Sequence, residues 1–539
     1  MRVLLLSTPY PLEENPLPPL SLAYLAGALR KEGFEVKILD YLVAGYNPSK
    51  LRRELELYRP KLVGATCVTL NYPIARRMLR LCKQFDPDIV TVIGGPHVTF
   101  ALEETLLPSP WIDLVCIGEG ERTIVDLARA VEGGKDVHLV SGVAFADGGK
   151  VVKTAPQSPV ENLDDLPLPA RELLPISRYL ALNSPCTVIT GRGCPYRCIF
   201  CSGRRMFGPK VRFRSPGLVV DEIEKIQRDF AFPQINIVDD TFTLNKRHAT
   251  EVCEEMLRRN LKVKWSAFAR ADTITPDLAQ LMRKAGCEWV LFGVESADEN
   301  ILRTIKKGIT PADVELGVKI ATEAGINVFN SFILGLPGET MDTALKSMAF
   351  AAEIHRRYGA RYGFHILSPL PGTELYERPE QFSLRILTRN WSRYNANEPV
   401  TETPTMSPEM VKEVIGKYDR MIEEVWKDIR RRALSGDVSC MEQIEGKQRQ
   451  EFIWTLFHGD VIEKLGRVSH QSFSSSEAEA ELVRKISQKF NLDIESTGRR
   501  IRELITKGLL QLVSRGNALR WQWADSQELA LRREATATT

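Results

Sequence analysis

Three cysteines that could hold a metal cluster lie close together near the middle of the chain. Cys194, Cys198 and Cys201 occur within the run G-R-G-C-P-Y-R-C-I-F-C. Cysteine thiolates hold iron–sulfur clusters, and short spacings let one loop wrap around a cluster. Three thiolates on a [4Fe–4S] cube would leave one iron open, as catalytic metal sites keep a vacant position. The spacing therefore favours a reactive [4Fe–4S] site.

Two alternatives to that site are chance clustering and a structural zinc site with a distant fourth ligand. Zinc sites are usually built from paired C-x-x-C half-sites, which makes zinc the weaker interpretation. The chain has ten cysteines in 539 residues, and its first residues lack the features of a signal peptide. These cysteines predict reduced thiols in the cytoplasm rather than a disulfide scaffold.

The region around the cysteines alternates strand-like runs with amphipathic helical segments. Six such units predict a partial, TIM-like (β/α)6 barrel, whose active site should lie at the carboxyl ends of its strands. Cys194 follows the first run, the pair Asp239 and Asp240 ends the second, and Glu295 ends the fourth. The six runs are TVITGRG, INIVDDTF, VKWSAFA, WVLFGVES, VFNSFILG and RYGFHILS.

The first part of the chain has the same alternation of strands and helices. It predicts an α/β fold with a doubly wound, Rossmann- or flavodoxin-like parallel sheet. Ligands of such sheets bind outside the carboxyl ends of the strands. Two of those ends are rich in small and turn-forming residues. They comprise Gly94, Gly95, Pro96 and His97, and then Gly118, Glu119 and Gly120.

Composition and pattern divide the chain into five segments. We expect the first domain at 1–145, a proline-rich linker at 146–185 and the barrel at 186–395. A helical region should follow at 396–470, and a winged-helix-like module at 471–539. The module is predicted from two helices and a hairpin around Arg515–Asn517. A net charge of +3 and the lack of any 18-residue apolar stretch give no support to nucleic-acid or membrane binding.

At the cysteine run the chain resembles the radical S-adenosylmethionine (SAM) superfamily, over about residues 186–375. The match is C-x-x-x-C-x-aromatic-C after the first barrel strand, with ILGLPGET and SPLPGTELY further on. The resemblance implies that the amine and carboxylate of SAM bind the open iron. An electron from an external donor of flavodoxin or ferredoxin type would then release a 5′-deoxyadenosyl radical.

The same resemblance assigns further cofactor contacts. Phe200 would lie near the adenine and Arg270 would bind the SAM carboxylate, while Tyr196 is a further expected contact. The pair Asp239–Asp240 would meet the methionine amine. Glu295 and Ser296 would contact the ribose or the methionine. The alternative interpretation of the two aspartates is that they cap a helix. The alternative for the other residues is that they are only the buried ends of strands.

The first domain resembles the cobalamin-binding domains that precede some radical SAM enzymes. The matching text is PPLSLAYLAGALRKEGFEV, VIGGPHVTF and VCIGEGERT. Such domains carry the motif D-x-H-x-x-G, but here the run Asp40–Gly45 has Leu42 at the histidine position. We expect cobalamin to bind without a lower histidine ligand. The alternative is a flavodoxin-like domain that binds nothing.

Further cobalamin contacts are expected at the ends of the third and fourth strands. Thr66, with Thr69 or Leu70 just beyond it, would lie beneath the corrin. Gly94 and Gly95 would admit the nucleotide tail, because glycine lets a ligand approach the backbone closely.

The two resemblances together imply a cobalamin-dependent radical methyltransferase. It would methylate an unactivated carbon of a small-molecule or peptide substrate, using the 5′-deoxyadenosyl radical and methylcobalamin. A radical cyclase or rearranging enzyme, similar to the anaerobic porphyrin-ring cyclases, is the alternative. A third interpretation is a cobalamin-sensing regulator that binds DNA through the terminal module. Its basic edge comprises Arg499, Arg500, Arg502 and Lys507, but with the overall charge near neutral a solvated helix face is the favoured interpretation of these residues.

Overall fold

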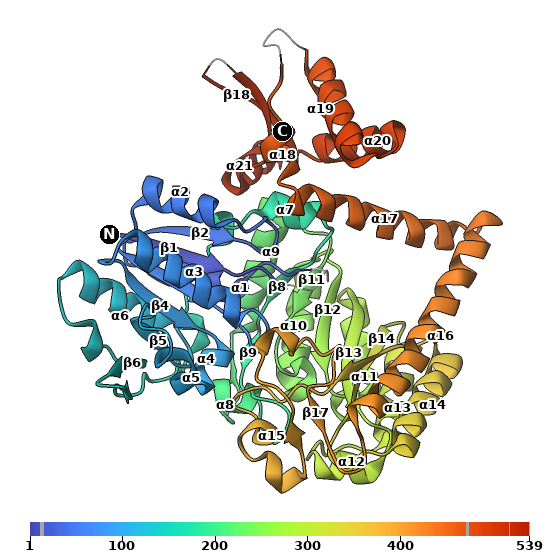
Figure 1. The fold of residues 1–539 in the computed structure, drawn as a ribbon. Coiled ribbons are helices and arrows are strands. Elements are labelled where there is room, and N and C mark those ends of the chain that lie inside the picture. The colour runs from blue at the N-terminus through green and yellow to red at the C-terminus, as the bar shows by residue number, and fades with distance from the viewer. Residues whose placement is uncertain (11–15, 470–473, 517, 538–539) are drawn as a thin grey trace.

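The computed structural model describes residues 1–10, 16–469, 474–516 and 518–537 (Figure 1). Its first unit is built on a seven-stranded sheet in the order β2-β1-β3-β4-β5-β6-β7. The first five strands are parallel in the order 2-1-3-4-5, which is the flavodoxin-like order, so the predicted doubly wound sheet is confirmed. These five strands are β1 (Arg2–Ser7), β2 (Glu35–Asp40), β3 (Leu62–Thr66), β4 (Val90–Gly94) and β5 (Leu114–Cys116).

Helices cover this sheet, and an antiparallel hairpin extends it. The hairpin, β6 (Val143–Asp147) and β7 (Lys150–Lys153), continues the sheet past residue 145, where the sequence placed the end of the domain. The helices are α1 (Leu20–Lys31), α2 (Pro48–Tyr58), α3 (Tyr72–Phe85), α4 (Pro96–Phe100), α5 (Leu102–Leu106) and α6 (Glu121–Glu132).

The second unit has six parallel strands in strict chain order, as predicted for a partial barrel. They are β8 (Cys186–Val188), β11 (Ile235–Ile237), β12 (Trp265–Ala269), β13 (Cys287–Glu295), β14 (Asn327–Leu334) and β15 (Arg361–Ile366). The helices between them are α9 (Pro216–Phe230), α10 (Lys246–Arg258), α11 (Pro276–Lys284), α12 (Glu299–Thr304), α13 (Pro311–Glu323) and α14 (Met341–Tyr358).

Short elements connect the two units and carry the cysteine run. That run lies between the strands of a small antiparallel hairpin, β9 (Gly191–Arg192) and β10 (Arg212–Phe213), with α8 (Gly203–Phe207) after it. The linker forms α7 (Ile176–Ala181). Past the barrel come α15 (Glu374–Glu377), β16 (Arg385–Ile386) and β17 (Thr401–Glu402).

The last part of the chain is helical and ends in the predicted pair of helices and hairpin. Figure 1 shows α16 leaving the barrel and α17 crossing toward α7 and the terminal module. Of the predicted module, residues 471–473, 517 and 538–539 lie outside the described part of the chain, and with Asn517 so does part of the predicted turn. The elements are α16 (Pro408–Leu434), α17 (Val438–His458), α18 (Val461–Leu465), α19 (Ser475–Phe490), α20 (Ile494–Thr506), β18 (Leu510–Arg515), β19 (Ala518–Trp523) and α21 (Ser526–Ala537).

One hydrophobic core joins the first unit, the barrel and the terminal module, and it fixes their arrangement. It runs from the first sheet through the barrel into the terminal module, with Leu22, Val188 and Trp521 among its buried members. The terminal module is also held by hydrogen bonds from the linker. Ser177 donates to the Ala524 carbonyl at 2.8 Å, and the Ile176 amide donates to Ser526 Oγ at 3.0 Å. Among the described helices, none combines the length and apolar character needed to cross a membrane.

Candidate active site

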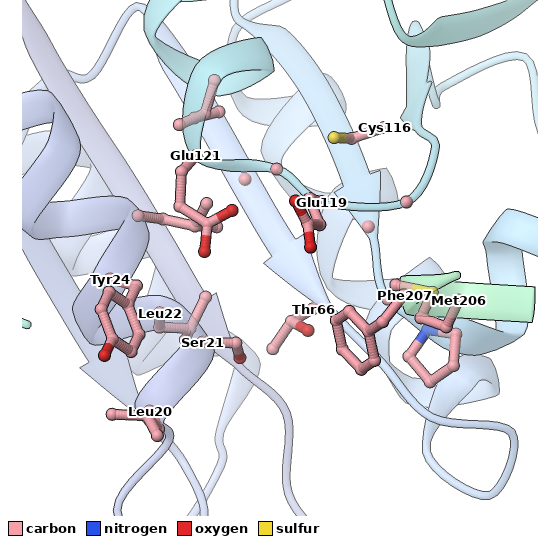
Figure 2. Close-up of a pocket in the computed structure, with 18 of the residues that line it drawn as sticks. Leu20, Ser21, Leu22, Tyr24, Thr66, Cys116, Glu119, Glu121, Met206 and Phe207 are labelled. Atoms are coloured by element: carbon pink, nitrogen blue, oxygen red, sulfur yellow. The ribbon is translucent and has the colours of Figure 1, made fainter. Parts of the chain in front are cut away.

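A cavity of about 390 Å³ lies where the carboxyl ends of the two sets of strands face each other (Figure 2). Seven residues that the sequence assigned to cobalamin line it, together with Asp240 from the barrel. The first and second units therefore both contribute to this cavity, although the three cysteines, Arg270 and Glu295 are not among the residues that line it. The seven are Thr66, Gly94, Gly95, Pro96, Gly118, Glu119 and Gly120.

Glycine is required at two points of the cavity wall. Gly95 has φ +111°, and a Cβ atom there would lie 2.2 Å from the Cys67 carbonyl oxygen. Gly118 has φ +73°, a conformation that side chains other than glycine rarely adopt. No side chain projects from the backbone at these two turns, so a bulky ligand can approach the backbone closely there.

Three of the residues expected to contact cobalamin lie elsewhere. Thr69, Leu70 and His97 are buried and do not line the cavity. The nearby residue that does line it is Val68, whose side chain is 42% exposed. Sequence reasoning missed Val68 because KLVGATCV reads as one buried strand. The strand instead ends at Thr66, so the alternation of buried and exposed side chains changes there.

His97 lies in an aromatic box behind the cavity. Its ring centroid is 4.3 Å from that of Tyr72 and 5.0 Å from that of Trp391, and Nδ1 is 3.2 Å from Thr69 Oγ1. Burial lowers the pKa of His97 to about 4. The imidazole is therefore a neutral packing group, not a candidate ligand for cobalt.

The burial of His97 in this aromatic box predicts that acid lowers the stability of the folded protein. Because the folded pKa of His97 is about 4 against 6.5 in the unfolded chain, the unfolded state binds more protons between these values. Stability should fall as pH drops through this window, by roughly 2 kcal/mol at pH 4.5 from this residue alone. His97→Phe should remove that loss, as measured by urea unfolding at pH 7 and pH 4.5. If both proteins lost the same free energy of unfolding between pH 7 and pH 4.5, the low pKa assigned to His97 would be contradicted.

The loop that replaces the D-x-H-x-x-G motif is held by other parts of the chain. Asp40 is buried and accepts hydrogen bonds from the Tyr179 hydroxyl at 2.5 Å and the Leu42 amide at 3.0 Å. Burial raises the pKa of Asp40. A Cβ on Gly45 would lie 3.2 Å from Asp460, in the turn between α17 and α18. Asp40 thus has a tyrosine partner where the motif would supply a histidine.

The three cysteines project from the loop between β9 and α8. Cys194 and Cys198 are half-buried and Cys201 is exposed, whereas the other seven cysteines are buried. Burial raises the pKa of Cys194, and neighbouring Asp240 and Cys198 add to this effect. Within the described residues, no three His, Cys, Asp or Glu side chains meet closely enough to hold a single metal ion.

The two adjacent aspartates at the end of β11 have different roles. Asp239 is buried and accepts hydrogen bonds from the Thr190 amide at 2.7 Å, the Gly191 amide at 3.2 Å and the Thr190 hydroxyl. Its oxygens are thereby used to join β11 to β8, and burial raises its pKa to about 6. Asp240 lines the cavity, and a Cβ on Gly203 would lie 2.9 Å from its Oδ1. Asp240 is therefore the aspartate placed to meet a ligand.

Three hydrogen bonds orient Arg270, which directly follows β12. Its Nε and Nη2 donate to the two oxygens of Asp272, each at 3.0 Å, and Nη1 donates to the Lys307 carbonyl at 3.1 Å. The guanidinium lies 3.7 Å from the ring centroid of Tyr196. One N–H on each terminal nitrogen is left over by these three bonds and is available to an anionic ligand.

Glu295 ends β13 in a strained conformation. Its φ is +67°, the β13–β14 register shifts beside it, and its carboxylate pairs with Lys307 Nζ at 2.6 Å. The same ammonium lies 5.9 Å from the ring centroid of Phe200. Backbone strain of this kind is found preferentially at functional sites.

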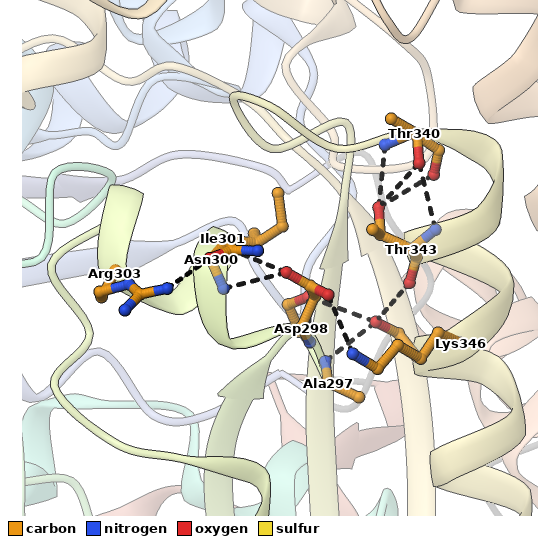
Figure 3. Close-up of polar contacts among 10 residues, drawn as sticks. Ala297, Asp298, Asn300, Ile301, Arg303, Thr340, Thr343 and Lys346 are labelled. Carbon is orange, nitrogen blue, oxygen red and sulfur yellow. Dashed lines mark hydrogen bonds and ion pairs between the residues drawn. The ribbon is translucent and has the colours of Figure 1, made fainter.

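Ser296 faces away from the cavity. It is buried beside Ser347 of α14, and its Oγ accepts a hydrogen bond from the Asp298 amide at 3.1 Å. Figure 3 shows the adjoining contacts, in which Asp298 caps α12 and pairs with Lys346 at 2.9 Å. This geometry gives Ser296 a local structural role.

The basic residues of the terminal module are mostly engaged within the protein. Arg500 donates to the Gln448 carbonyl at 2.8 Å, and Arg499 lies 3.6 Å from Glu445. Arg502 pairs with Glu479 at 3.1 Å, and Lys507 with Glu503 at 2.6 Å. These contacts favour a solvated, paired helix face over a DNA-binding surface.

Comparisons with known families agree with this architecture. The family model "Radical SAM superfamily" matches residues 188–351, and "B12 binding domain" matches residues 14–128. An uncharacterized methyltransferase of Pyrococcus horikoshii is 35% identical, over 74% of this chain and 86% of its own. An anaerobic magnesium-protoporphyrin IX monomethyl ester cyclase of Rubrivivax gelatinosus is 31% identical, over 75% and 73%.

Two solved structures share the fold. The radical SAM methyltransferase TsrM from Kitasatospora setae, with cobalamin and a [4Fe–4S] cluster bound, superposes with a TM-score of 0.60 at 22% identity, covering 76% of this chain and 84% of its own. The cobalamin-dependent SAM radical enzyme OxsB gives a TM-score of 0.66 at 19% identity, covering 99% and 83%. This chain belongs to the radical SAM superfamily, among the members that carry a B12-binding domain ahead of the radical SAM domain.

Proposed function

We propose that this protein is a cobalamin-dependent radical SAM methyltransferase acting on an unactivated carbon. The observation that carries the proposal is the shared cavity, because Gly94 and Gly118 of the first unit and Asp240 of the second line the same space. Methyl transfer to a substrate radical needs the methyl donor and the radical source on either side of one carbon. The relative from Pyrococcus horikoshii, whose length this chain largely covers, is named a methyltransferase.

The residues present fit the three cofactors. Cys194, Cys198 and Cys201 would hold a [4Fe–4S] cluster, and Asp240, Arg270 and Glu295 would bind SAM. When bound, the cluster and SAM supply a 5′-deoxyadenosyl radical, and cobalamin supplies the methyl group. The protein contributes orientation, through Asp272 on Arg270 and Lys307 on Glu295. It also excludes water through a mainly apolar cavity wall that includes Leu22, Val68 and Phe207.

None of the histidines in the described part of the chain lines the cavity, so we propose that the lower face of the cobalt has no histidine ligand from this chain. Val68 supplies an aliphatic side chain at the end of β3 instead. The superhyperfine splitting of an axial nitrogen should therefore be absent from the electron paramagnetic resonance spectrum of the cobalt(II) form. Observing that splitting would contradict this assignment.

The cyclase alternative rests on the relative from Rubrivivax gelatinosus. The two functions differ in how SAM is consumed. Each methylated product requires one SAM as the methyl source, which leaves S-adenosylhomocysteine, and a second SAM as the radical source, which leaves 5′-deoxyadenosine. A cyclase has no methyl to transfer and forms no S-adenosylhomocysteine. Quantifying both nucleosides during turnover tests the proposal, which expects comparable amounts and is refuted by 5′-deoxyadenosine alone.

We further propose that a small acidic redox protein supplies the electron. Residues 191–214 contain seven Arg or Lys and no Asp or Glu. Arg197 is exposed between two of the cysteines, and Arg204 at the start of α8 donates to the Pro195 carbonyl at 2.5 Å. In the described part of the chain no carboxylate pairs with either residue. Such a positive surface beside an exposed Cys201 suits an acidic partner.

Charge reversal at Arg197 tests this surface. Arg197→Glu should slow reduction by a flavodoxin by about tenfold at low salt, because it removes electrostatic attraction to an acidic partner. The difference should shrink as salt rises. With dithionite, a small inorganic reductant, the variant should match the unmodified protein in 5′-deoxyadenosine formation. Equal rates with flavodoxin would argue against this docking surface.

The ten free cysteines support a reducing compartment, and we place the protein in the cytoplasm on that ground.

For the substrate we propose a small molecule or a peptide.

A further inference from the structure

Two buried arginines face each other on the hairpin that carries the cysteine loop. Arg192 of β9 and Arg212 of β10 are direct cross-strand partners, and their side chains are only 9% and 5% exposed. Like charges placed opposite each other repel, and buried charges must be paired. The hairpin therefore needs carboxylates from elsewhere in the protein.

Both carboxylates come from the first unit. Glu119 approaches Arg212 with both oxygens, Oε1 2.5 Å from Nη2 and Oε2 3.0 Å from Nη1, and its Oε1 is 3.6 Å from Arg192. Glu121 Oε1 accepts from Arg192 Nη2 at 2.5 Å. Burial raises the pKa of Glu119, but the hydrogen bond from Arg212 and the charge of Arg192 outweigh it and hold the pKa below its ordinary value. We call Arg192, Arg212, Glu119 and Glu121 together the four-charge network.

The network touches each part of the candidate site. Glu119 and Glu121 lie on the cavity wall, as Figure 2 shows, and Arg192 lies two residues before Cys194. Arg212 also donates to the carbonyls of Phe207, another cavity residue, and of the linker residue Val160, at 3.1 and 2.7 Å. The second oxygen of Glu121 is buried with no partner in the described part of the chain, so it can accept a hydrogen bond from a ligand.

We propose that the four-charge network is a positioning device for methyl transfer. It fixes the wall of the first unit's cavity relative to the cysteine loop, so that cobalamin held in the cavity would meet the methyl carbon of SAM. The S–CH3 bond of SAM would break in this transfer, and S-adenosylhomocysteine would be the leaving group. This inference rests on the proposed function. Transfer requires near contact of the reacting atoms, roughly 3–3.5 Å, and small displacements slow it sharply. Apolar packing between the units is non-directional, whereas a forked arginine–carboxylate pair fixes both distance and orientation.

A paired substitution separates positioning from stability. Removing only one member would leave a buried charge unpaired and would destabilise the fold for an unrelated reason. The test protein therefore carries Arg212→Gln and Glu119→Gln together, which keeps similar side-chain shapes and leaves no unpaired charge. The matched control is Arg171→Gln, which breaks an equally buried pair with Glu222 that does not line the cavity. Glu222 keeps its second partner, Arg214, at 2.5 Å, so the control also leaves no unpaired charge.

The measurement uses the reconstituted full-length protein with cobalamin and SAM carrying a deuterated methyl group. With cobalamin supplied at a saturating concentration, cluster content and 5′-deoxyadenosine formation, which depend on the cysteine loop and the barrel, should stay near their normal values in the double variant. Transfer of the labelled methyl group to cobalamin should fall at least about tenfold. The Arg171→Gln protein should keep the normal ratio of methyl transfer to 5′-deoxyadenosine.

An unchanged ratio in the double variant overturns the inference. So does loss of cobalamin or cluster, since that marks a purely structural role. If the unmodified protein transfers no methyl group, the proposed function fails, and hydrogen exchange then decides about the network. Faster exchange at residues 118–121 and 191–193 in the double variant supports its role in joining the units, and unchanged exchange refutes that role.

Discussion

Replacing Cys198 with alanine is expected to abolish cluster assembly and, with it, all formation of 5′-deoxyadenosine from SAM. Cys198 is the middle of three thiols on one loop, and the remaining two cannot hold a [4Fe–4S] cube without a third. The loop itself should persist, because it is held through backbone bonds such as that from the Ile199 amide to the Ile305 carbonyl at 3.2 Å. Iron and sulfide content and chromatography of the anaerobic reaction measure the two losses.

Cys253→Ala is the matched control. Cys253 is buried in α10 and does not line the cavity, and its thiol takes no part in the candidate site. This variant should keep full iron content and 5′-deoxyadenosine formation. Residual 5′-deoxyadenosine from the Cys198→Ala protein would show that the cluster is not held as assigned.

The second large effect is expected from filling the cavity at Gly94. A tryptophan at this position would project from the end of β4 into the cavity of about 390 Å³ and occupy the space needed by a corrin or its nucleotide tail. Gly94→Trp should therefore weaken cobalamin binding by at least about 100-fold, an effect of roughly 3 kcal/mol. The cluster should be unaffected, because no cysteine ligand touches Gly94. Equilibrium titration by absorbance measures the affinity.

The Gly94→Ala variant distinguishes the effect of side-chain bulk from the effect of losing the backbone freedom of glycine. A Cβ at Gly94 would have Cys116 Cβ as its nearest neighbour at 3.7 Å, an ordinary contact, and the φ of Gly94 is not in the left-handed region. The alanine variant should bind cobalamin almost normally. Weak binding by the alanine variant, or normal binding by the tryptophan variant, would show that cobalamin does not enter this cavity.

The fold could be predicted largely because its hydrophobic pattern is strong. The two series of buried strands alternate with amphipathic helices, and parallel strands then bring their carboxyl ends to one edge. The hairpin β6–β7 was not predicted, because KVVK and VAFAD are short and partly exposed at the edge of the sheet. The cysteine spacing was the most informative local signal, since few other structures require three thiols in eight residues.

The parts of the site that sequence reasoning missed depend on tertiary contacts. Arg192 and Glu121 are 71 residues apart, and nothing in either local sequence indicates that they pair. Asp239 and Asp240 are chemically identical, and only the turn of the chain after β11 sends one toward Thr190 and the other into the cavity. His97 follows a Gly-Gly-Pro turn typical of a ligand loop, yet the first turn of α4 directs it into the aromatic box.

The central claim is that cobalamin bound in the first unit receives a methyl group from SAM bound in the barrel. The most direct test is to incubate the reconstituted protein anaerobically with cobalamin, a reductant and SAM whose methyl group is deuterated, and then to analyse the extracted cobalamin by mass spectrometry. We predict cobalamin carrying the deuterated methyl group, together with S-adenosylhomocysteine, and neither in the Gly94→Trp protein. Unmodified cobalamin, recovered while 5′-deoxyadenosine accumulates, would contradict the methyltransferase assignment.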